Sequence, residues 1–195
     1  SLVVSGGRTP LAFFHLLSQQ VLDWSKVVVT LADDRWVDAD HGDSNEKLVR
    51  ENLLINEAHT AAFIPLKNAA MDAAEGEIQT ESDIEQMGQF TVVILGMGDD
   101  GHTASLFPGA ETLALGLDMN SGRSAIAVTP TAAPHQRMTL TLPRLLNSQQ
   151  IIIHISGAGK QAVLKAAQAG EDITELPIRA MLNQQVAPLS IFWAK

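Results

Sequence analysis

One stretch of the sequence constrains the fold more than any other. It runs from Gly96 to Gly109 (Gly-Met-Gly-Asp-Asp-Gly-His-Thr-Ala-Ser-Leu-Phe-Pro-Gly) and directly follows residues 90–95, a short apolar run that predicts a buried strand. Three glycines within six positions allow the backbone to turn sharply at the strand end. Such a loop would hold one histidine and two carboxylates at the carboxyl edge of a sheet, where open α/β folds bind ligands.

The rest of the chain alternates between strand and helix patterns. Short apolar runs predict further strands at 2–5, 27–32, 125–129, 137–142 (half-buried), 151–155 and 189–194, and helical spacing predicts helices at about 9–23, 44–56, 69–88, 157–170 and 177–184. Thr9 followed by Pro10 is typical of a helix start, and Asp43 with Glu46 resembles a capping box. Residues 109–124 read as a loop. The alternation predicts an α/β fold with a largely parallel sheet.

Length and composition narrow the class of protein. A chain of 195 residues with 46% hydrophobic residues is most simply one domain with a substantial core. No apolar run approaches the ~20 residues of a membrane span, and the net charge of −9 argues against a nucleic-acid surface. The absence of cysteine excludes thiolate chemistry and, with no signal-peptide pattern, favours the cytoplasm.

Two familiar site types fit poorly. Gly96 to Gly101 matches G-x-G-x-x-G, but Asp99 and Asp100 would face a pyrophosphate with like charge, and Pro108 follows too soon for a long helix. The six histidines are scattered without a metal-ligand spacing, so no metal site is expected.

Two other strand ends favour an anion. The segment from Ser5 to Pro10 (Ser-Gly-Gly-Arg-Thr-Pro) offers backbone N–H groups and a helix start that suit a phosphate, although an ordinary tight turn has the same pattern. The segment from Ser156 to Lys160 repeats this arrangement, and Lys160 in the first helical turn opposes the helix dipole, which favours a lysine placed for an anion. Arg137 alone is equally compatible with a surface salt bridge.

His102 is the strongest candidate for chemistry. It lies between Gly101 and Thr103, two residues after Asp100, and a histidine in such a loop can act as a general base near neutral pH. The alternative is a histidine that is only hydrogen-bonded within its loop. The cluster Asp33-Asp34-Arg35 at a strand end is either a structural ion pair or part of the same site.

Taken together, these elements resemble the 6-phosphogluconolactonase branch of the glucosamine-6-phosphate isomerase/6-phosphogluconolactonase superfamily. The matching segments are Ser5 to Pro10, Asp33 to Arg35, Asp43 to Asn45, Gly96 to Gly109, Arg137 to Pro143 and Gly157 to Lys160. The resemblance implies a three-layer α/β/α Rossmann-like fold and hydrolysis of 6-phospho-D-glucono-1,5-lactone, with no metal or organic cofactor. It further implies that a helical segment typical of the family is missing before the first strand. For the oligomeric state, we expect a monomer or a weak dimer.

The resemblance also implies roles for individual residues. His102 would activate water as general base, Asp100 would orient it, and Arg35 would stabilise charge on the carbonyl oxygen. The substrate and its phosphate would be bound by Ser5, Gly6, Gly7, Thr9, Asp33, Arg137 and Lys160.

Two other functions compete with this one. The isomerase/deaminase branch of the superfamily typically carries a Glu and Asn-Glu-Pro after the shared histidine, whereas His102 is followed by Thr-Ala-Ser-Leu-Phe-Pro. A non-catalytic sugar-phosphate sensor would need no base, so the joint presence of His102, Asp100 and Arg35 argues against it.

Overall fold

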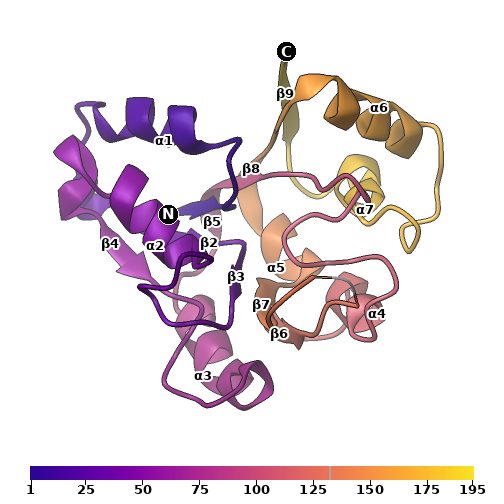
Figure 1. Cartoon of the computed structure of the whole chain (residues 1–195), viewed down its shortest axis with the longest axis horizontal. Helices are drawn as coiled ribbons and strands as arrows, with labels where there is room; N and C mark the ends of the chain where they lie inside the picture. Colours follow the sequence, from indigo (N-terminus) through magenta and orange to yellow (C-terminus); the bar gives the residue numbers. More distant parts are fainter. Residues whose placement is uncertain (132) are drawn as a thin grey trace.

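The computed structural model describes residues 1–131 and 133–195, and it is an α/β structure built on a parallel sheet (Figure 1). In spatial order the strands of this central sheet are β4 (Ala62–Ile64), β2 (Val28–Leu31), β1 (Leu2–Val4), β5 (Phe90–Leu95), β8 (Ser148–Ser156) and β9 (Leu189–Ala194). Every neighbouring pair is parallel. The predicted fold class, with helices flanking a largely parallel sheet, is confirmed.

The strand order explains where a site can form. From β1 the chain adds β2 and then β4 on one side, whereas β8 and β9 are added after β5 on the other side. The connections therefore diverge between β1 and β5, and such a switch point opens a crevice at the carboxyl ends of the strands. Ser5 follows β1 and Gly96 follows β5, and the Gly96 N–H donates to Ser5 Oγ over 3.4 Å across this point.

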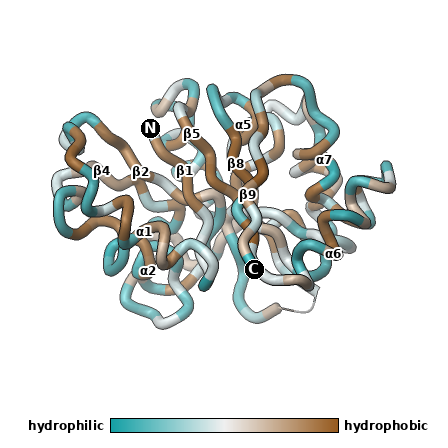
Figure 2. The backbone as a smooth tube through the Cα atoms, turned by 90° about the horizontal axis from the view of Figure 1, so that it is seen from above, coloured by the Kyte–Doolittle hydropathy of each residue, from teal (hydrophilic) through white to brown (hydrophobic). Residues whose placement is uncertain are grey.

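The central strands bury both faces, as parallel sheets do. Val3 and Val4, successive residues of β1 that point to opposite faces, are fully buried, and Val93 and Ile94 on β5 are 0% and 6% exposed. In Figure 2 the labelled central strands lie side by side and carry most of the hydrophobic colouring. The site is thus built on the most rigid part of the molecule.

A second, antiparallel sheet was only partly predicted. Its order is β3 (Asp33–Arg35), β7 (Arg137–Leu140) and β6 (Ala125–Val128). The sequence predicted β6 and β7, although β7 is buried at all four residues rather than half-buried and ends at Leu140. The expectation that Asp33 to Arg35 merely ends a strand was wrong, because these residues form a strand that pairs with β7.

Helices cover the sheets on both sides. They are α1 (Leu11–Ser18), α2 (Asn45–Asn52), α3 (Ala73–Glu85), α4 (Leu113–Leu117), α5 (Leu142–Leu146), α6 (Gly157–Gln168) and α7 (Ile178–Asn183), with 3₁₀ turns at Trp24–Lys26 and Asn56–Thr60. Figure 1 shows α1 and α2 at one end of the molecule and α6 and α7 at the other. Within the described residues, no helix is long and apolar enough to cross a bilayer.

Several predicted helix boundaries were wrong for local reasons. Helix α1 begins at Leu11 after Pro10, without a side-chain cap, so Thr9 is not its N-cap. Ser44 rather than Asp43 caps α2, because its Oγ accepts the Lys47 N–H at 3.2 Å. Helix α1 also ends at Ser18 instead of residue 23, and the expected loop at 109–124 contains the short helix α4.

A buried arginine joins α3 to α5. Arg144 is only 6% exposed, and its Nη2 donates to the carbonyls of Ile84 (3.0 Å) and Gly88 (2.7 Å) at the carboxyl end of α3. Its guanidinium lies 3.6 Å from the centroid of the Phe90 ring at the start of β5. Burial lowers the pKa of Arg144 to about 10, so the side chain stays charged at neutral pH.

We expect Arg144→Met to destabilise the fold by about 3 kcal/mol, because the buried carbonyl of Ile84 and the carbonyl of Gly88 would lose a charged donor. Chemical denaturation with a linear extrapolation measures this free energy of unfolding. Lys26→Met, which removes a largely exposed cation, is the matched control and should change stability little. An Arg144→Met variant as stable as the control would show that this arginine does not hold α3.

Candidate active site

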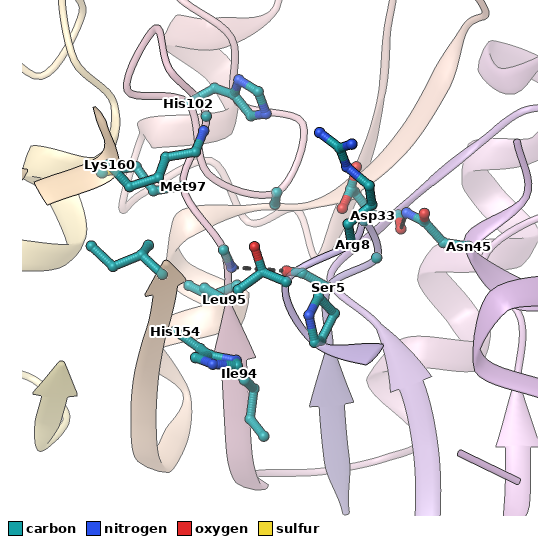
Figure 3. Close-up of a pocket in the computed structure, with 18 of the residues that line it drawn as sticks. Ser5, Arg8, Asp33, Asn45, Ile94, Leu95, Met97, His102, His154 and Lys160 are labelled. Carbon is teal, nitrogen blue, oxygen red and sulfur yellow. Dashed lines mark hydrogen bonds between the residues drawn. The ribbon is translucent and has the colours of Figure 1, made fainter. Parts of the chain in front are cut away.

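A cavity of about 270 Å³ lies at the switch point between β1 and β5. Figure 3 shows His102 and Lys160 on one side of it, Asp33 and Asn45 on the other, and Ser5 at the strand ends between them. The predicted site residues that line it are Ser5, Gly6, Gly7, Thr9, Asp33, Arg35, His102, Arg137 and Lys160. Asp100 does not line the cavity but contacts His102 directly.

His102 and Asp100 form a hydrogen-bonded pair. His102 Nδ1 lies 2.5 Å from Asp100 Oδ1, which also accepts the His102 backbone N–H at 3.2 Å. A carboxylate at this position requires the proton on Nδ1, which leaves the lone pair of Nε2 available. Partial burial raises the pKa of Asp100, but the His102 ring and its backbone N–H outweigh this and hold that pKa below its usual value. The carboxylate is therefore ionised when it orients the imidazole.

The glycines of the loop are needed for space and for backbone shape. A Cβ on Gly98 would stand 2.1 Å from His102 Nδ1 and 2.4 Å from Asp100 Oδ1, so only glycine leaves room for the pair. Gly101 has a φ of +75°, which other residues rarely adopt, and its carbonyl accepts the N–H of Ile178 at 2.9 Å. The loop that carries His102 is thus tied to the start of α7.

The Phe107 ring lies close to both His102 and Arg137. The Phe107 ring lies 4.3 Å from the His102 ring, centroid to centroid, and 5.6 Å from the guanidinium carbon of Arg137. Phe107 comes from the same glycine-rich loop and packs against the imidazole at an interplanar angle of 45°. Its packing role was not predicted from the sequence.

Two arginines lie side by side at one wall of the cavity. Arg35 on β3 is directly opposite Arg137 on β7 in the antiparallel register. Burial and the neighbouring charge of Arg35 lower the pKa of Arg137. Within the described residues, Nε of each arginine is buried without a hydrogen-bond partner. Because like charges held together favour an anion between or beside them, the pair makes this wall suited to an anionic or carbonyl oxygen.

Asp33 is held in place by groups that the sequence did not single out as site residues. Ser105 Oγ donates to Asp33 Oδ2 at 2.5 Å, and Asn45 Nδ2 donates to the Asp33 carbonyl at 2.8 Å. Asn45 also approaches the first loop so closely that a Cβ on Gly6 would lie 1.9 Å from its Oδ1. The motif from Asp43 to Asn45 was the only sequence signal for this contact.

Other residues that the sequence predicted to bind an anion lie around the same cavity. Gly7 has a φ of +90° and opens the β1–α1 loop, and Thr9 Oγ1 lies 3.5 Å from Ser156 Oγ at the start of α6. Lys160 lines the cavity and is ion-paired with Asp99 at 2.9 Å. Because Asp99 is 87% exposed, this ion pair is weak, and Lys160 can exchange it for a ligand.

Asp34 has a structural rather than a ligand-facing position. Its carboxylate accepts the backbone N–H groups of Arg35 (2.8 Å), Asn45 (2.7 Å) and Glu46 (3.1 Å), and so joins β3 to the start of α2. Burial nevertheless raises the pKa of Asp34 to about 6. The sequence left open whether the cluster of Asp33, Asp34 and Arg35 is structural or part of the site. In the structure, Asp33 and Arg35 line the cavity, whereas Asp34 does not.

The raised pKa of Asp34 predicts that the free energy of unfolding depends on pH. A carboxyl whose pKa is higher in the folded than in the unfolded state stabilises the fold below pH 4 and loses that contribution as the pH rises through about 6. We therefore expect the stability of the native protein to fall relative to that of Asp34→Asn by about 2 kcal/mol between pH 4 and pH 7. Urea denaturation across this range measures the difference, with the exposed Asp40→Asn as control. A difference that is constant with pH would contradict the raised pKa.

Comparison with known proteins gives the chain a family. The model of the family described as glucosamine-6-phosphate isomerases/6-phosphogluconolactonase matches residues 1–193. The 6-phosphogluconolactonase of Rhizobium meliloti (strain 1021) is 45% identical over 195 residues, which cover 100% of this chain and 84% of that protein. The 6-phosphogluconolactonase of Pseudomonas putida is 42% identical over 98% of this chain and 78% of its own length.

A solved structure agrees with these relatives. The crystal structure of a 6-phosphogluconolactonase from Shewanella baltica OS155 superposes with a TM-score of 0.97 and is 46% identical in sequence. The comparison covers 100% of this chain and 83% of that one. The resemblance inferred from short motifs therefore extends over the whole chain.

Proposed function

We infer that this chain hydrolyses 6-phospho-D-glucono-1,5-lactone to 6-phosphogluconate in the pentose phosphate pathway. The inference starts from its family, since the chain belongs to the glucosamine-6-phosphate isomerase/6-phosphogluconolactonase family. The observation that carries the mechanism is the pair of His102 and Asp100 at a cavity lined by several cations. A cytoplasmic location and a monomeric or weakly dimeric state stay predictions.

His102 is the general base in this proposal. Its Nε2 takes a proton from a water molecule, whose oxygen attacks C1 of the lactone and forms a tetrahedral intermediate. When that intermediate collapses, the bond between C1 and the ring oxygen breaks, and the imidazolium returns the proton to the ring oxygen. Asp100 keeps the proton on Nδ1 and stabilises the imidazolium charge, because its carboxylate stays ionised.

Arg35 is assigned to the developing negative charge. The carbonyl oxygen of the lactone gains charge in the tetrahedral intermediate, and a positioned guanidinium stabilises that charge more than the neutral ground state. Arg35 is held for this role, since its Nη1 donates to the Asp43 carbonyl at 2.6 Å and its backbone N–H binds Asp34. Asp33, fixed by Ser105, faces the hydroxyl groups of the sugar in this pose.

The phosphate is assigned to donors of the β1–α1 loop together with Arg137 and Lys160. Backbone N–H groups of Gly6 and Gly7, the hydroxyls of Ser5 and Thr9, and the charges of Arg137 and Lys160 offer the donors that a phosphate dianion requires. Binding there positions the lactone carbonyl towards His102, so that phosphate affinity contributes to orientation.

The isomerase/deaminase reaction of the same family is disfavoured by the residues after His102. Thr103, Ala104 and Ser105 are buried, and none supplies the carboxylate expected for ring-opening chemistry. Release of ammonia from glucosamine 6-phosphate at a rate matching lactone hydrolysis would overturn this choice. A non-catalytic sugar-phosphate sensor would also release no ammonia. Unlike the lactonase, however, it would not hydrolyse the lactone.

Activity should depend on the phosphate and on Lys160. We expect fast hydrolysis of the phosphorylated lactone and slow hydrolysis of gluconolactone, measured above the spontaneous rate. Lys160→Met should raise KM for the phosphorylated substrate about tenfold or more, since it removes a charge-assisted hydrogen bond. Lys165→Met, an exposed lysine on the same helix, is the control. Equal KM values for the two variants would remove Lys160 from the phosphate site.

The catalytic pair makes a separate prediction. His102→Asn should lower kcat by about 10²–10⁴-fold, whereas the affinity for 6-phosphogluconate changes little. Asp100→Asn should lower kcat less, because Asp100 acts through His102. Steady-state kinetics and calorimetric titration measure the two quantities, and the exposed His59→Gln serves as control. Parallel losses of rate and affinity in His102→Asn would make His102 a binding residue instead.

A further inference from the structure

Three side chains with metal-binding chemistry lie together outside the catalytic cavity. His41 and Asp43 come from the loop before α2, and His135 from the loop before β7. One potential ligand atom of each lies within 4.8 Å of the others. His135 Nε2 is 3.0 Å from Asp43 Oδ2, and the two imidazole rings meet edge to face with centroids 5.4 Å apart.

We propose that His41, Asp43 and His135 bind a divalent transition-metal ion of the Zn²⁺ class. Two imidazoles and one carboxylate are the ligand set of such ions rather than of Mg²⁺ or Ca²⁺, which prefer oxygen ligands alone. Three protein ligands leave the remaining coordination positions to water. The ligand atoms lie within 4.8 Å of one another, and because His41 and Asp43 are exposed, small rotations of their side chains can adjust these distances to those of a bound ion.

The backbone of the first two ligands is already fixed. The His41 N–H donates to the Asp38 carbonyl at 2.9 Å, and the Ser44 N–H donates to the His41 carbonyl at 3.1 Å. Asp43 is held through its own carbonyl, which accepts Arg35 Nη1, so its backbone is fixed independently of its carboxylate. Little chain entropy would be lost on binding.

The third ligand is fixed from the other side. The carbonyl of Gln136 accepts the Trp36 N–H at 2.7 Å, and its side-chain oxygen accepts the Ala73 N–H at 3.2 Å. His135, directly before it, has a φ of +68°, an uncommon conformation that the pairing of Gln136 maintains. The ring of His135 is thereby directed at Asp43.

The ion would connect the loop that follows Arg35 to the loop that precedes Arg137. Asp43 binds Arg35 through its carbonyl, and His135 is two residues before Arg137. None of the three ligands lines the catalytic cavity. The site is therefore distinct from the lactonase chemistry, and it was invisible in the sequence because Asp43 and His135 are 92 positions apart.

Titration of untagged, metal-free full-length protein with Zn²⁺ by calorimetry tests the proposal. We expect one ion per chain, and His41→Ala, Asp43→Asn and His135→Ala should each weaken binding. Loss of a group that only orients a metal ligand costs about 10- to 100-fold in affinity, so loss of a ligand should cost at least as much. His59→Ala, an exposed histidine elsewhere, is the matched control and should bind as the native chain does.

A second readout is the visible spectrum of the Co²⁺-loaded protein. We expect ligand-field bands in the native chain and in His59→Ala that disappear in His41→Ala and His135→Ala. Thermal unfolding of each variant without metal checks that it is folded. Absence of Zn²⁺ binding to the native chain, or equal binding by the native chain and both folded histidine variants, would overturn the proposal.

Discussion

The parallel pairing of β1 and β5 is the constraint on which the site depends. The sheet continues from β1 through β2 and β4 on one side, and from β5 through β8 and β9 on the other. No connecting helix therefore lies between the loops that follow β1 and β5. Ser5 and Gly96, one from each loop, are joined by a hydrogen bond across the gap. Val4 and Leu95, at the ends of these strands, are buried, so the loops with the proposed phosphate-binding and catalytic residues rest on the hydrophobic core.

Charge is distributed unevenly around this base. The chain is acidic overall, yet Arg35, Arg137 and Lys160 all line the cavity. The antiparallel pairing of β3 with β7 forces the two arginines together, and burial at Arg137 strengthens their effect on an anion. The carboxylates nearby are committed elsewhere, because Asp34 binds backbone N–H groups and Asp100 binds His102.

The sequence predicted those parts of the molecule that depend on local pattern. Apolar runs identified the central strands, and the glycines from Gly96 to Gly101 marked the catalytic loop, since Gly98 and Gly101 serve the space and backbone shape that this loop needs. Strand β3 was missed because three charged residues carry no apolar alternation; its pairing with β7 is a long-range effect. The contacts of Ser105 and Asn45 with Asp33 depend on the same tertiary pairing. The motifs therefore named residues most of which line one cavity, but they did not predict the mutual arrangement of these residues.

The most direct test of the account is a crystal structure with bound 6-phosphogluconate. The account predicts the phosphate between Lys160 and the loop of Gly6 and Gly7, with the C1 carboxylate within about 3 Å of His102 Nε2 and beside Arg35. That result would place the reacting carbon at the base and the anion at the cationic loop. A product bound in the reverse orientation, with its phosphate at His102, would contradict the roles assigned to His102 and to the phosphate-binding groups.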